Sequence, residues 1–204
     1  MARLGIFGGT FDPPHLGHLI LAEEAFHQLK LDRLLWVLTP DPPHKLDKAI
    51  TPLQHRLDML AAAIGDNPHF EISLIEINRP GPHYSVDTLR ILSTLQPGAD
   101  FVFLMGGDSL HDLPMWKDPL ELVNKISILG VMRRPGAIID FAILDEKVPG
   151  LREKVRFVSA PLIDISASDI RCRVAQGAPI RYFVPPDVYR IIIERGLYRN
   201  DPVK

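Results

Sequence analysis

The 204-residue sequence has little cysteine, no long apolar run and no strong net charge. Its single cysteine, Cys172, excludes an internal disulfide framework and suits a reducing compartment. No apolar run approaches the roughly 20 residues that cross a bilayer, and Met1-Ala2-Arg3 leads into the first expected strand without a signal-peptide region. The net charge of -2 gives no basic field for nucleic acid. These absences predict a cytoplasmic protein with neither a membrane nor a nucleic acid as partner.

Two common phosphate-binding patterns are also missing, because the sequence contains neither G-x-G-x-x-G nor G-x-x-x-x-G-K-[ST]. In their place, residues 8–18, here called the first signature, read G-G-T-F-D-P-P-H-L-G-H. They lie between an apolar run at Leu4 to Phe7, typical of a buried strand, and apolar residues at helical spacing from Leu19 to Leu29. A helix start beyond a strand offers unpaired N–H groups and a positive dipole end, which suit phosphate.

His15 and His18 add two hydrogen-bond donors at this helix start. They also fit a helix cap or a metal pair. Zinc would need a third ligand, and the sequence has neither a cysteine cluster nor an H-E-x-x-H motif to supply one. We therefore favour contact with a nucleotide phosphate and expect no metal held by protein side chains.

Strands alternate with helices along the chain, which predicts an α/β fold with a Rossmann-like, doubly wound parallel sheet. We expect one domain over residues 1–204, with a small helical part from about residue 166. The pattern of residues 138–149 is ambiguous, and they are left unassigned. The expected strands cover Leu4–Phe7, Leu34–Thr39, Phe70–Ile77, Phe101–Met105, Ile126–Met132 and Val155–Val158, and the expected helices cover Leu19–Leu29, Pro52–Ile64, Val86–Leu95, Ser166–Val174 and Asp187–Glu194.

A second anion site is predicted at residues 165–171, here called the second signature, which read I-S-A-S-D-I-R. The Ser166 and Ser168 hydroxyls and the unpaired N–H groups of a helix start can bind phosphate oxygens. Arg171, one turn further on, can donate two hydrogen bonds to them. Alone, this pattern also fits an ordinary serine cap with a surface arginine. Together with the first signature, it gives two helix starts that can clasp one polyphosphate.

The first signature resembles the (H/T)-x-G-H motif of the nucleotidyltransferase superfamily, in the form G-(S/T)-F-D-P-x-H-x-G-H that is similar to bacterial nicotinate-nucleotide adenylyltransferases. The second resembles the I-S-S-T-x-I-R pattern of that family, with Ala167 and Ser168 in place of Ser and Thr. The resemblance extends from Leu4 to the last helix. It implies the nucleotidyltransferase fold and the joining of ATP and nicotinate mononucleotide to give deamido-NAD and pyrophosphate in NAD biosynthesis, with Mg²⁺ carried by ATP.

Further segments match the same family and take their roles from the resemblance. Lys45 lies in P-P-H-K, whose lysine is assigned to phosphate, although a loop lysine is often simply solvated. Gly106-Gly107-Asp108 resembles G-x-D, whose aspartate contacts sugar hydroxyls, although it also fits a helix cap. Trp116 matches the aromatic residue that stacks on the pyridine ring, although tryptophan also suits a core. Residues 84–89 resemble Y-T-x-D-T-L, which lines the nicotinate carboxylate pocket, with Ser85 in place of Thr.

The expected site combines these residues in three groups. The residues expected to act in catalysis are His15, His18, Lys45 and Arg171. Those expected to bind ATP are Gly8, Gly9, Thr10, Phe11, His15, His18, Gly106, Asp108, Ile165, Ser166, Ser168 and Arg171. Those expected to bind the nicotinate nucleotide are Thr10, Lys45, Tyr84, Ser85, Thr88 and Trp116.

Two alternatives stay open at this point. The acceptor of the adenylyl group could be another compound, nicotinamide mononucleotide or phosphopantetheine, or the chain could be a non-catalytic nucleotide sensor on the same fold. The intact pair His15 and His18 argues against a sensor, because binding alone does not need donors for a transition state. A homo-oligomer is compatible with the sequence, which carries no signal of the oligomeric state.

Overall fold

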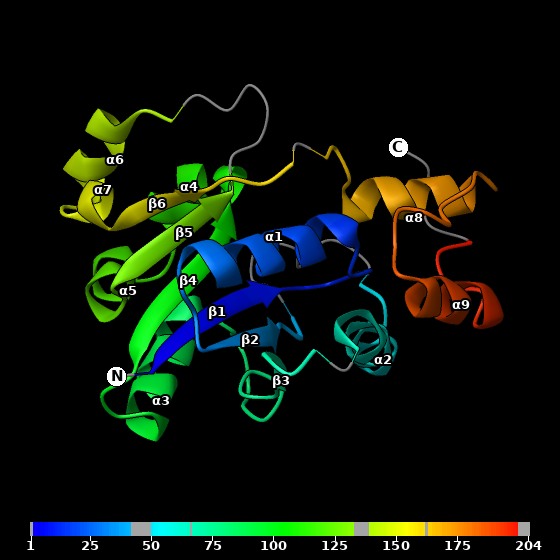
Figure 1. The fold of residues 1–204 in the computed structure, drawn as a ribbon, viewed down its shortest axis with the longest axis horizontal. Helices are drawn as coiled ribbons and strands as arrows, with labels where there is room; N and C mark the ends of the chain where they lie inside the picture. Colours follow the sequence, from blue (N-terminus) through cyan, green and yellow to red (C-terminus); the bar gives the residue numbers. More distant parts are fainter. Residues whose placement is uncertain (1, 42–49, 66, 133–138, 162, 200–204) are drawn as a thin grey trace.

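The computed structural model describes residues 2–41, 50–65, 67–132, 139–161 and 163–199 (Figure 1). Six parallel strands form one sheet in the order β3-β2-β1-β4-β5-β6. The strand order reverses between the central strands β1 and β4, which makes this the switch point of a doubly wound sheet. The strands are β1 Arg3–Gly9, β2 Arg33–Leu38, β3 Phe70–Ser73, β4 Asp100–Gly106, β5 Ile128–Met132 and β6 Val155–Val158.

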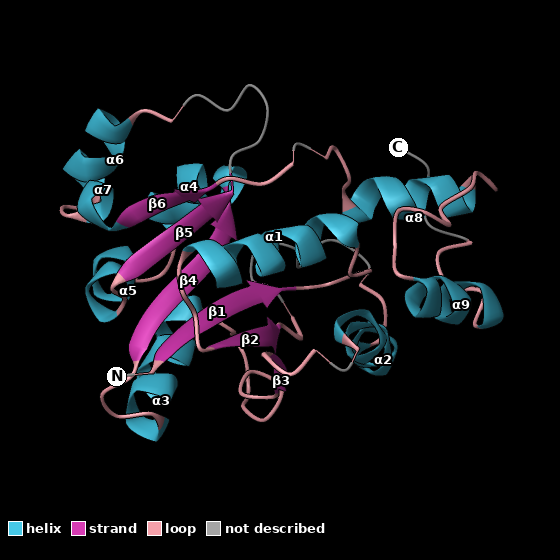
Figure 2. Cartoon of the chain, in the orientation of Figure 1, coloured by secondary structure: helices cyan, strands magenta, loops and turns pink. Residues whose placement is uncertain are grey.

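Helices cover both faces of the sheet, which confirms the expected α/β class (Figure 2). On one face, Ala25 of α1 is buried in the same apolar cluster as Trp36 of β2. On the other, Leu89 of α3 is buried with Phe103 of β4. The helices are α1 Leu16–Gln28, α2 Leu53–Ile64, α3 Ser85–Leu95, α4 Gly107–Asp112, α5 Pro119–Lys125, α6 Phe141–Lys147, α7 Leu151–Lys154, α8 Ala167–Ala175 and α9 Pro186–Glu194, with a 3-10 turn, η2, at Leu113–Met115.

The last two helices form a separate layer that packs on α2 rather than on the sheet (Figure 1). Met59 of α2 is buried there with Ile170 of α8 and Ile192 of α9. At the edge of this layer Arg195 pairs with Asp58 at 2.6 Å, and this hydrogen bond holds the pKa of Asp58 below its usual value. α8 and α9 lie in the part of the chain for which we expected additional helices.

The third strand is shorter than the sequence predicts. It ends at Ser73 rather than at Ile77, because the chain turns after it, with the Asn78 N–H donating to the Leu74 carbonyl oxygen at 2.9 Å. The prediction of a strand to Ile77 was therefore wrong. Glu76 lies in this turn and is buried in the interior.

The helices differ from the expectation in two places. α1 begins at Leu16 rather than Leu19, because His15 has the extended backbone of an N-cap residue. The unassigned stretch contains α6, whose start is fixed by the Asp140 side chain accepting from the Ala142 N–H at 2.9 Å. In the described part of the chain, no helix has the length and apolar character that crossing a membrane requires.

Gly130 lies where two buried leucine side chains meet. A Cβ atom placed on it would come within 2.6 Å of Leu104 Cδ2 and 2.7 Å of Leu29 Cδ1. A Cβ atom on Gly8, by contrast, would meet no atom within 4 Å. The two strand glycines therefore differ in packing, not in backbone conformation.

Gly130→Ala is expected to lower the free energy of unfolding by about 1–3 kcal/mol, because a methyl group in a filled core forces its neighbours out of their rotamers. Gly8→Ala is the matched control and should change it by less than about 1 kcal/mol. Urea unfolding midpoints at constant slope measure both effects. Equal midpoints for the two variants would contradict the packing described for Gly130.

Candidate active site

The first signature begins in the last two residues of β1, and the Gly106-Gly107-Asp108 segment begins at the last residue of β4, so both reach the switch point of the sheet. Ligands of open α/β sheets bind at this place, beyond the carboxyl ends of the strands. The backbone has room there, because a Cβ atom on Gly8 or Gly106 would meet no atom within 4 Å. The Asp108 side chain and Lys45 lie outside the part of the structure that is described.

His15 and His18 face each other at the start of α1. Their ring centroids are 3.7 Å apart and their planes are inclined by 30°. The His15 N–H donates to His18 Nδ1 at 3.2 Å, so Nδ1 is an acceptor and the proton of a neutral His18 ring is on Nε2. This bond fixes the tautomer of a neutral His18 ring.

Phe11 supports the His18 ring from the core. Its backbone is left-handed, with φ 47°, and its ring folds back over Gly9, where a Cβ atom would lie 2.9 Å from the ring. The ring is buried and meets His18 edge-on, with centroids 5.2 Å apart. Only glycine at position 9 leaves space for this turn. The contact of Phe11 with ATP stays a prediction.

Gly17 lies where the two signatures contact each other. A Cβ atom on it would lie 3.1 Å from two atoms of the His15 ring and 3.7 Å from the Ile165 carbonyl oxygen. The missing side chain therefore lets His15 lie across the first turn of α1. The second signature lies against the same turn, where the starts of α1 and α8 are neighbours (Figure 1).

The second signature forms the start of α8 as expected. Ser166 is the N-cap, and its hydroxyl accepts from the Asp169 N–H at 3.0 Å and lies 3.1 Å from the Ser168 hydroxyl. Arg171 Nη1 donates to the Asp12 carbonyl oxygen at 2.8 Å, across 159 residues of sequence. The arginine of one signature is thus bonded to the backbone of the other.

Asp12 is anchored by residues that the sequence did not single out. Its two carboxylate oxygens accept from the Tyr198 hydroxyl at 2.8 Å and from the Thr51 N–H at 3.1 Å. Asp12 and Tyr198 are both buried. Burial, together with the nearby Asp12 charge, raises the pKa of Tyr198 above its usual value. A residue close to the carboxyl end of the described chain therefore holds the loop of the first signature.

Arg56 on α2 joins the loops that follow β1 and β2. Its guanidinium is buried and donates to four carbonyl oxygens, those of Thr51 (2.8 Å), Thr10 (3.2 Å), Thr39 (2.8 Å) and Pro40 (2.7 Å). Burial lowers its pKa, against the opposing effect of the Asp12 and Asp41 charges. The signal for it in the sequence is spacing, because Arg56 occupies the buried stripe of α2 that includes Met59 and Leu60.

Four of the residues expected to bind the nicotinate nucleotide lie on the α3 side of the sheet, namely Tyr84, Ser85, Thr88 and Trp116. Tyr84 is the N-cap of α3, Ser85 is its first residue, and Tyr84 packs partly buried against the apolar cluster on this face. Trp116 follows η2 and packs against the same cluster. Its ring meets the Phe103 ring edge-on, with the ring centroids 6.2 Å apart. Thr88 is different, because its side chain is buried and its hydroxyl donates to Glu76.

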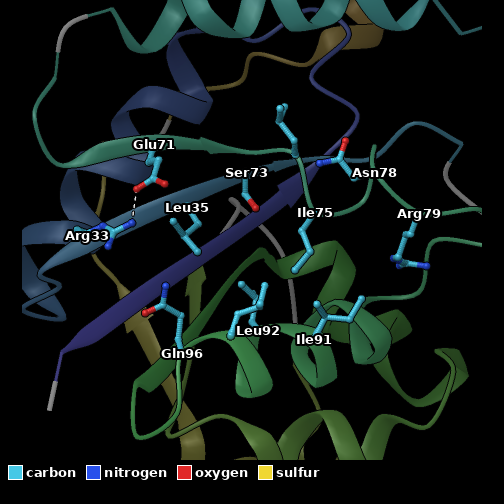
Figure 3. A pocket seen from close by; sticks show the side chains of 12 residues that line it. Arg33, Leu35, Glu71, Ser73, Ile75, Asn78, Arg79, Ile91, Leu92 and Gln96 are labelled. Atoms are coloured by element: carbon cyan, nitrogen blue, oxygen red, sulfur yellow. Dashed lines mark hydrogen bonds and ion pairs between the residues drawn. The ribbon is translucent and has the colours of Figure 1, made fainter.

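A groove of about 450 Å³ lies away from both signatures, between α3 and the strands β2 and β3 (Figure 3). Its apolar lining includes Leu35, Ile75 and Leu92, and the ion pair of Arg33 with Glu71 borders it. Neither signature contributes a residue to the lining. The candidate active site is therefore the switch point and not this groove.

A family model described as cytidylyltransferase-like matches residues 6–173, and the chain belongs to that family. This is the class that the parallel sheet and the paired helix starts define. Within it, a protein of Thermomicrobium roseum is 51% identical, over 98% of this chain and 93% of its own length. A protein of a Roseiflexus species is 46% identical, over 97% of this chain and 98% of its own length. Both carry the name "Probable nicotinate-nucleotide adenylyltransferase".

By this similarity along its whole length, the chain belongs to the nicotinate-nucleotide adenylyltransferases, as the resemblance of the signatures implied. Its fold agrees with a solved structure, Plasmodium falciparum nicotinic acid mononucleotide adenylyltransferase complexed with NaAD. That structure has a TM-score of 0.82 and 22% sequence identity, with 100% of each chain covered.

Tyr198→Phe is expected to lower the free energy of unfolding by about 1–3 kcal/mol near neutral pH, because it leaves a buried oxygen of Asp12 without its donor. The raised pKa of Tyr198 sets the sign of the pH dependence. The unfolded chain ionises this tyrosine first, so the stabilisation is fully present below about pH 10 and falls as the pH rises above it. Urea unfolding of both proteins on either side of about pH 10 measures the difference. A difference that grows with pH would be inconsistent with this assignment.

Proposed function

We propose that this chain catalyses the reaction that names its family, joining ATP and nicotinate mononucleotide to give deamido-NAD and pyrophosphate. One observation supports the proposal that this reaction takes place at the switch point. The starts of α1 and α8 lie together at the switch point, with the Ile165 carbonyl oxygen at Gly17 and Arg171 bonded to Asp12. Two helix starts at one place supply the unpaired N–H groups that a triphosphate needs.

The chemistry requires no general base. The phosphate of the mononucleotide is already a nucleophile, and one of its oxygens attacks the α-phosphorus of ATP in line with the leaving group. The new bond joins that oxygen to the α-phosphorus, and the bond from the α-phosphorus to the bridging oxygen breaks, releasing pyrophosphate. We assign to His18 Nε2–H and His15 the donation of hydrogen bonds to the charge that develops, and to Arg171 the holding of the outgoing pyrophosphate. Catalysis is then positioning and charge stabilisation.

The nicotinate ring is assigned to the α3 side of the site. The indole of Trp116 offers a flat surface for the ring. The first N–H groups of α3, at Ser85 and Val86, offer donors for the carboxylate, because helix starts leave such groups without intrahelical acceptors. The proposed contacts of Lys45 with phosphate and of Asp108 with ribose follow from the family resemblance alone.

The remaining partners are proposals of the same kind. Among the described residues, no three His, Cys, Asp or Glu side chains are arranged to hold a metal ion. We therefore propose that Mg²⁺ arrives with ATP as part of the substrate, bound by its phosphate oxygens. A cytoplasmic location, the lack of a nucleic-acid partner and a homo-oligomeric state stay predictions.

Pyrophosphate release from ATP tests the function directly, with nicotinate mononucleotide, nicotinamide mononucleotide or phosphopantetheine as the second substrate. Release with the first compound is the expected result. Release with phosphopantetheine alone would assign another acceptor. Nucleotide binding without any release would make the chain a sensor.

His18→Ala is expected to lower kcat by about 100- to 1,000-fold, because it removes one preorganised donor to the transition state. Folding, measured by thermal melting, and the KM for ATP should change little. Steady-state assays of the purified variant give the rate constants. A kcat close to that of the unaltered chain would exclude His18 from the mechanism.

Nicotinate mononucleotide is expected to exceed nicotinamide mononucleotide in kcat/KM by about 100-fold or more. A pocket of N–H donors suits a carboxylate, whereas it leaves the amide NH₂ facing other donors. A buried unpaired polar group costs about 1–3 kcal/mol, and about 1.4 kcal/mol is tenfold. Trp116→Ala should weaken both compounds alike, since stacking ignores the substituent. Specificity constants within a few-fold of each other would overturn this view of the pocket.

A further inference from the structure

A buried polar pair lies behind the first turn of α3. Glu76, in the turn after β3, is 4% exposed, and Thr88, on α3, is 2% exposed. The Thr88 hydroxyl donates to Glu76 Oε1 at 2.5 Å. A buried carboxyl group is costly without hydrogen bonds, so this bond constrains both side chains. The turn that ended β3 early is thereby fastened to the helix that carries the proposed carboxylate donors.

Arg79 connects this pair to the backbone at the helix start. Its guanidinium donates to the carbonyl oxygens of Pro82 at 3.0 Å and of Tyr84 at 3.3 Å. Its Nη2 also donates to Thr88 Oγ1 at 3.4 Å. Figure 3 shows Arg79 beside Asn78, at one end of the groove. Since Tyr84 is the N-cap of α3, Arg79 and Glu76 reach the same helix turn through separate bonds.

Three buried atoms of this region have no hydrogen-bond partner in the described structure. They are Glu76 Oε2, Arg79 Nε and His83 Nδ1. Buried polar atoms without partners are rare, and each one costs stability. An arrangement kept at such a cost is expected at functional sites rather than in parts of the fold that serve stability alone.

We infer that Glu76, Arg79 and Thr88 are positioning residues for the nicotinate carboxylate, an inference that rests on the proposed function. The first main-chain bonds of α3 run from the Asp87 and Thr88 N–H groups to the Tyr84 carbonyl oxygen, at 3.1 and 3.2 Å. The two N–H groups before them, at Ser85 and Val86, are the proposed carboxylate donors. The direction in which they point is set by the orientation of the first turn of α3. The Thr88 side chain thus acts through Glu76 and the helix, not on the substrate.

Thr88→Val tests this inference because it removes the hydroxyl and keeps the shape. The KM for nicotinate mononucleotide is expected to rise roughly tenfold, while kcat at saturation and the KM for ATP stay within about twofold. Thr88→Ser should restore the low KM. Thr94→Val is the matched control, because Thr94 lies exposed on the same helix and its hydroxyl bonds only its own helix, at the Arg90 carbonyl oxygen. Equal rises in the two KM values, or no rescue by serine, would overturn the inference.

Arg79→Met provides a second variant, on a side chain that is only half-buried. It should raise the KM for nicotinate mononucleotide and leave the KM for ATP unchanged. Arg33→Met is the control, because Arg33 borders the groove from β2, and it should change neither KM. If thermal melting shows that Thr88→Val does not fold, the KM values of Arg79→Met and Arg33→Met for nicotinate mononucleotide test the inference instead. An unaltered chain that shows no turnover with nicotinate mononucleotide would overturn the proposed function and this inference together. An active unaltered chain with an unchanged KM in Arg79→Met would overturn the inference alone.

Discussion

Asp12 holds together four parts of the chain that lie far apart in the sequence. Its carboxylate oxygens accept from the Tyr198 hydroxyl at 2.8 Å and the Thr51 N–H at 3.1 Å, and its carbonyl oxygen accepts from Arg171 at 2.8 Å. It lies between the glycines that end β1 and the histidines that begin α1. Breaking any of these bonds would leave a buried polar atom without a partner, so the loop is confined to one arrangement.

This constraint suits a reaction without proton transfer. When the nucleophile is already a phosphate, the protein contributes mainly the placing of donors and of two substrates. Polar side chains accordingly hold the chain next to the first signature and at the start of α3. Arg56 donates to four carbonyl oxygens in the loops that follow β1 and β2 and before α2, although burial lowers its pKa. At the start of α3, Arg79 donates to the Tyr84 carbonyl oxygen, and Glu76 accepts from the Thr88 hydroxyl.

Much of the fold and part of the site could be predicted from the sequence, because both depend on local patterns. Apolar runs predicted six strands, and the class followed from their alternation with helices. The residues 8–18 and 165–171 predicted two helix starts, which the structure places together. The interior was harder to predict. The residues up to Ile77 fit an extended strand by their pattern, yet the chain turns after Ser73. The turn buries Glu76 against Thr88, and Thr88 lies on a helix that follows later in the sequence, so a local pattern could not predict this contact.

The class of fold, the two signatures and the kind of ligand they suit follow from the sequence, since apolar periodicity and helix-start chemistry act within a few residues. Which side chains hold the first signature and the start of α3 in place follows from the packing of the folded chain. Arg56, Tyr198 and Glu76 are a helix arginine, a tyrosine near the carboxyl end of the described chain and a turn glutamate, and of these only Arg56 has a local signal, its spacing in the buried stripe of α2. Their hydrogen bonds join residues from distant segments. Such bonds exist only once the sheet has brought those segments together, because direction and burial of a side chain are properties of the packed chain.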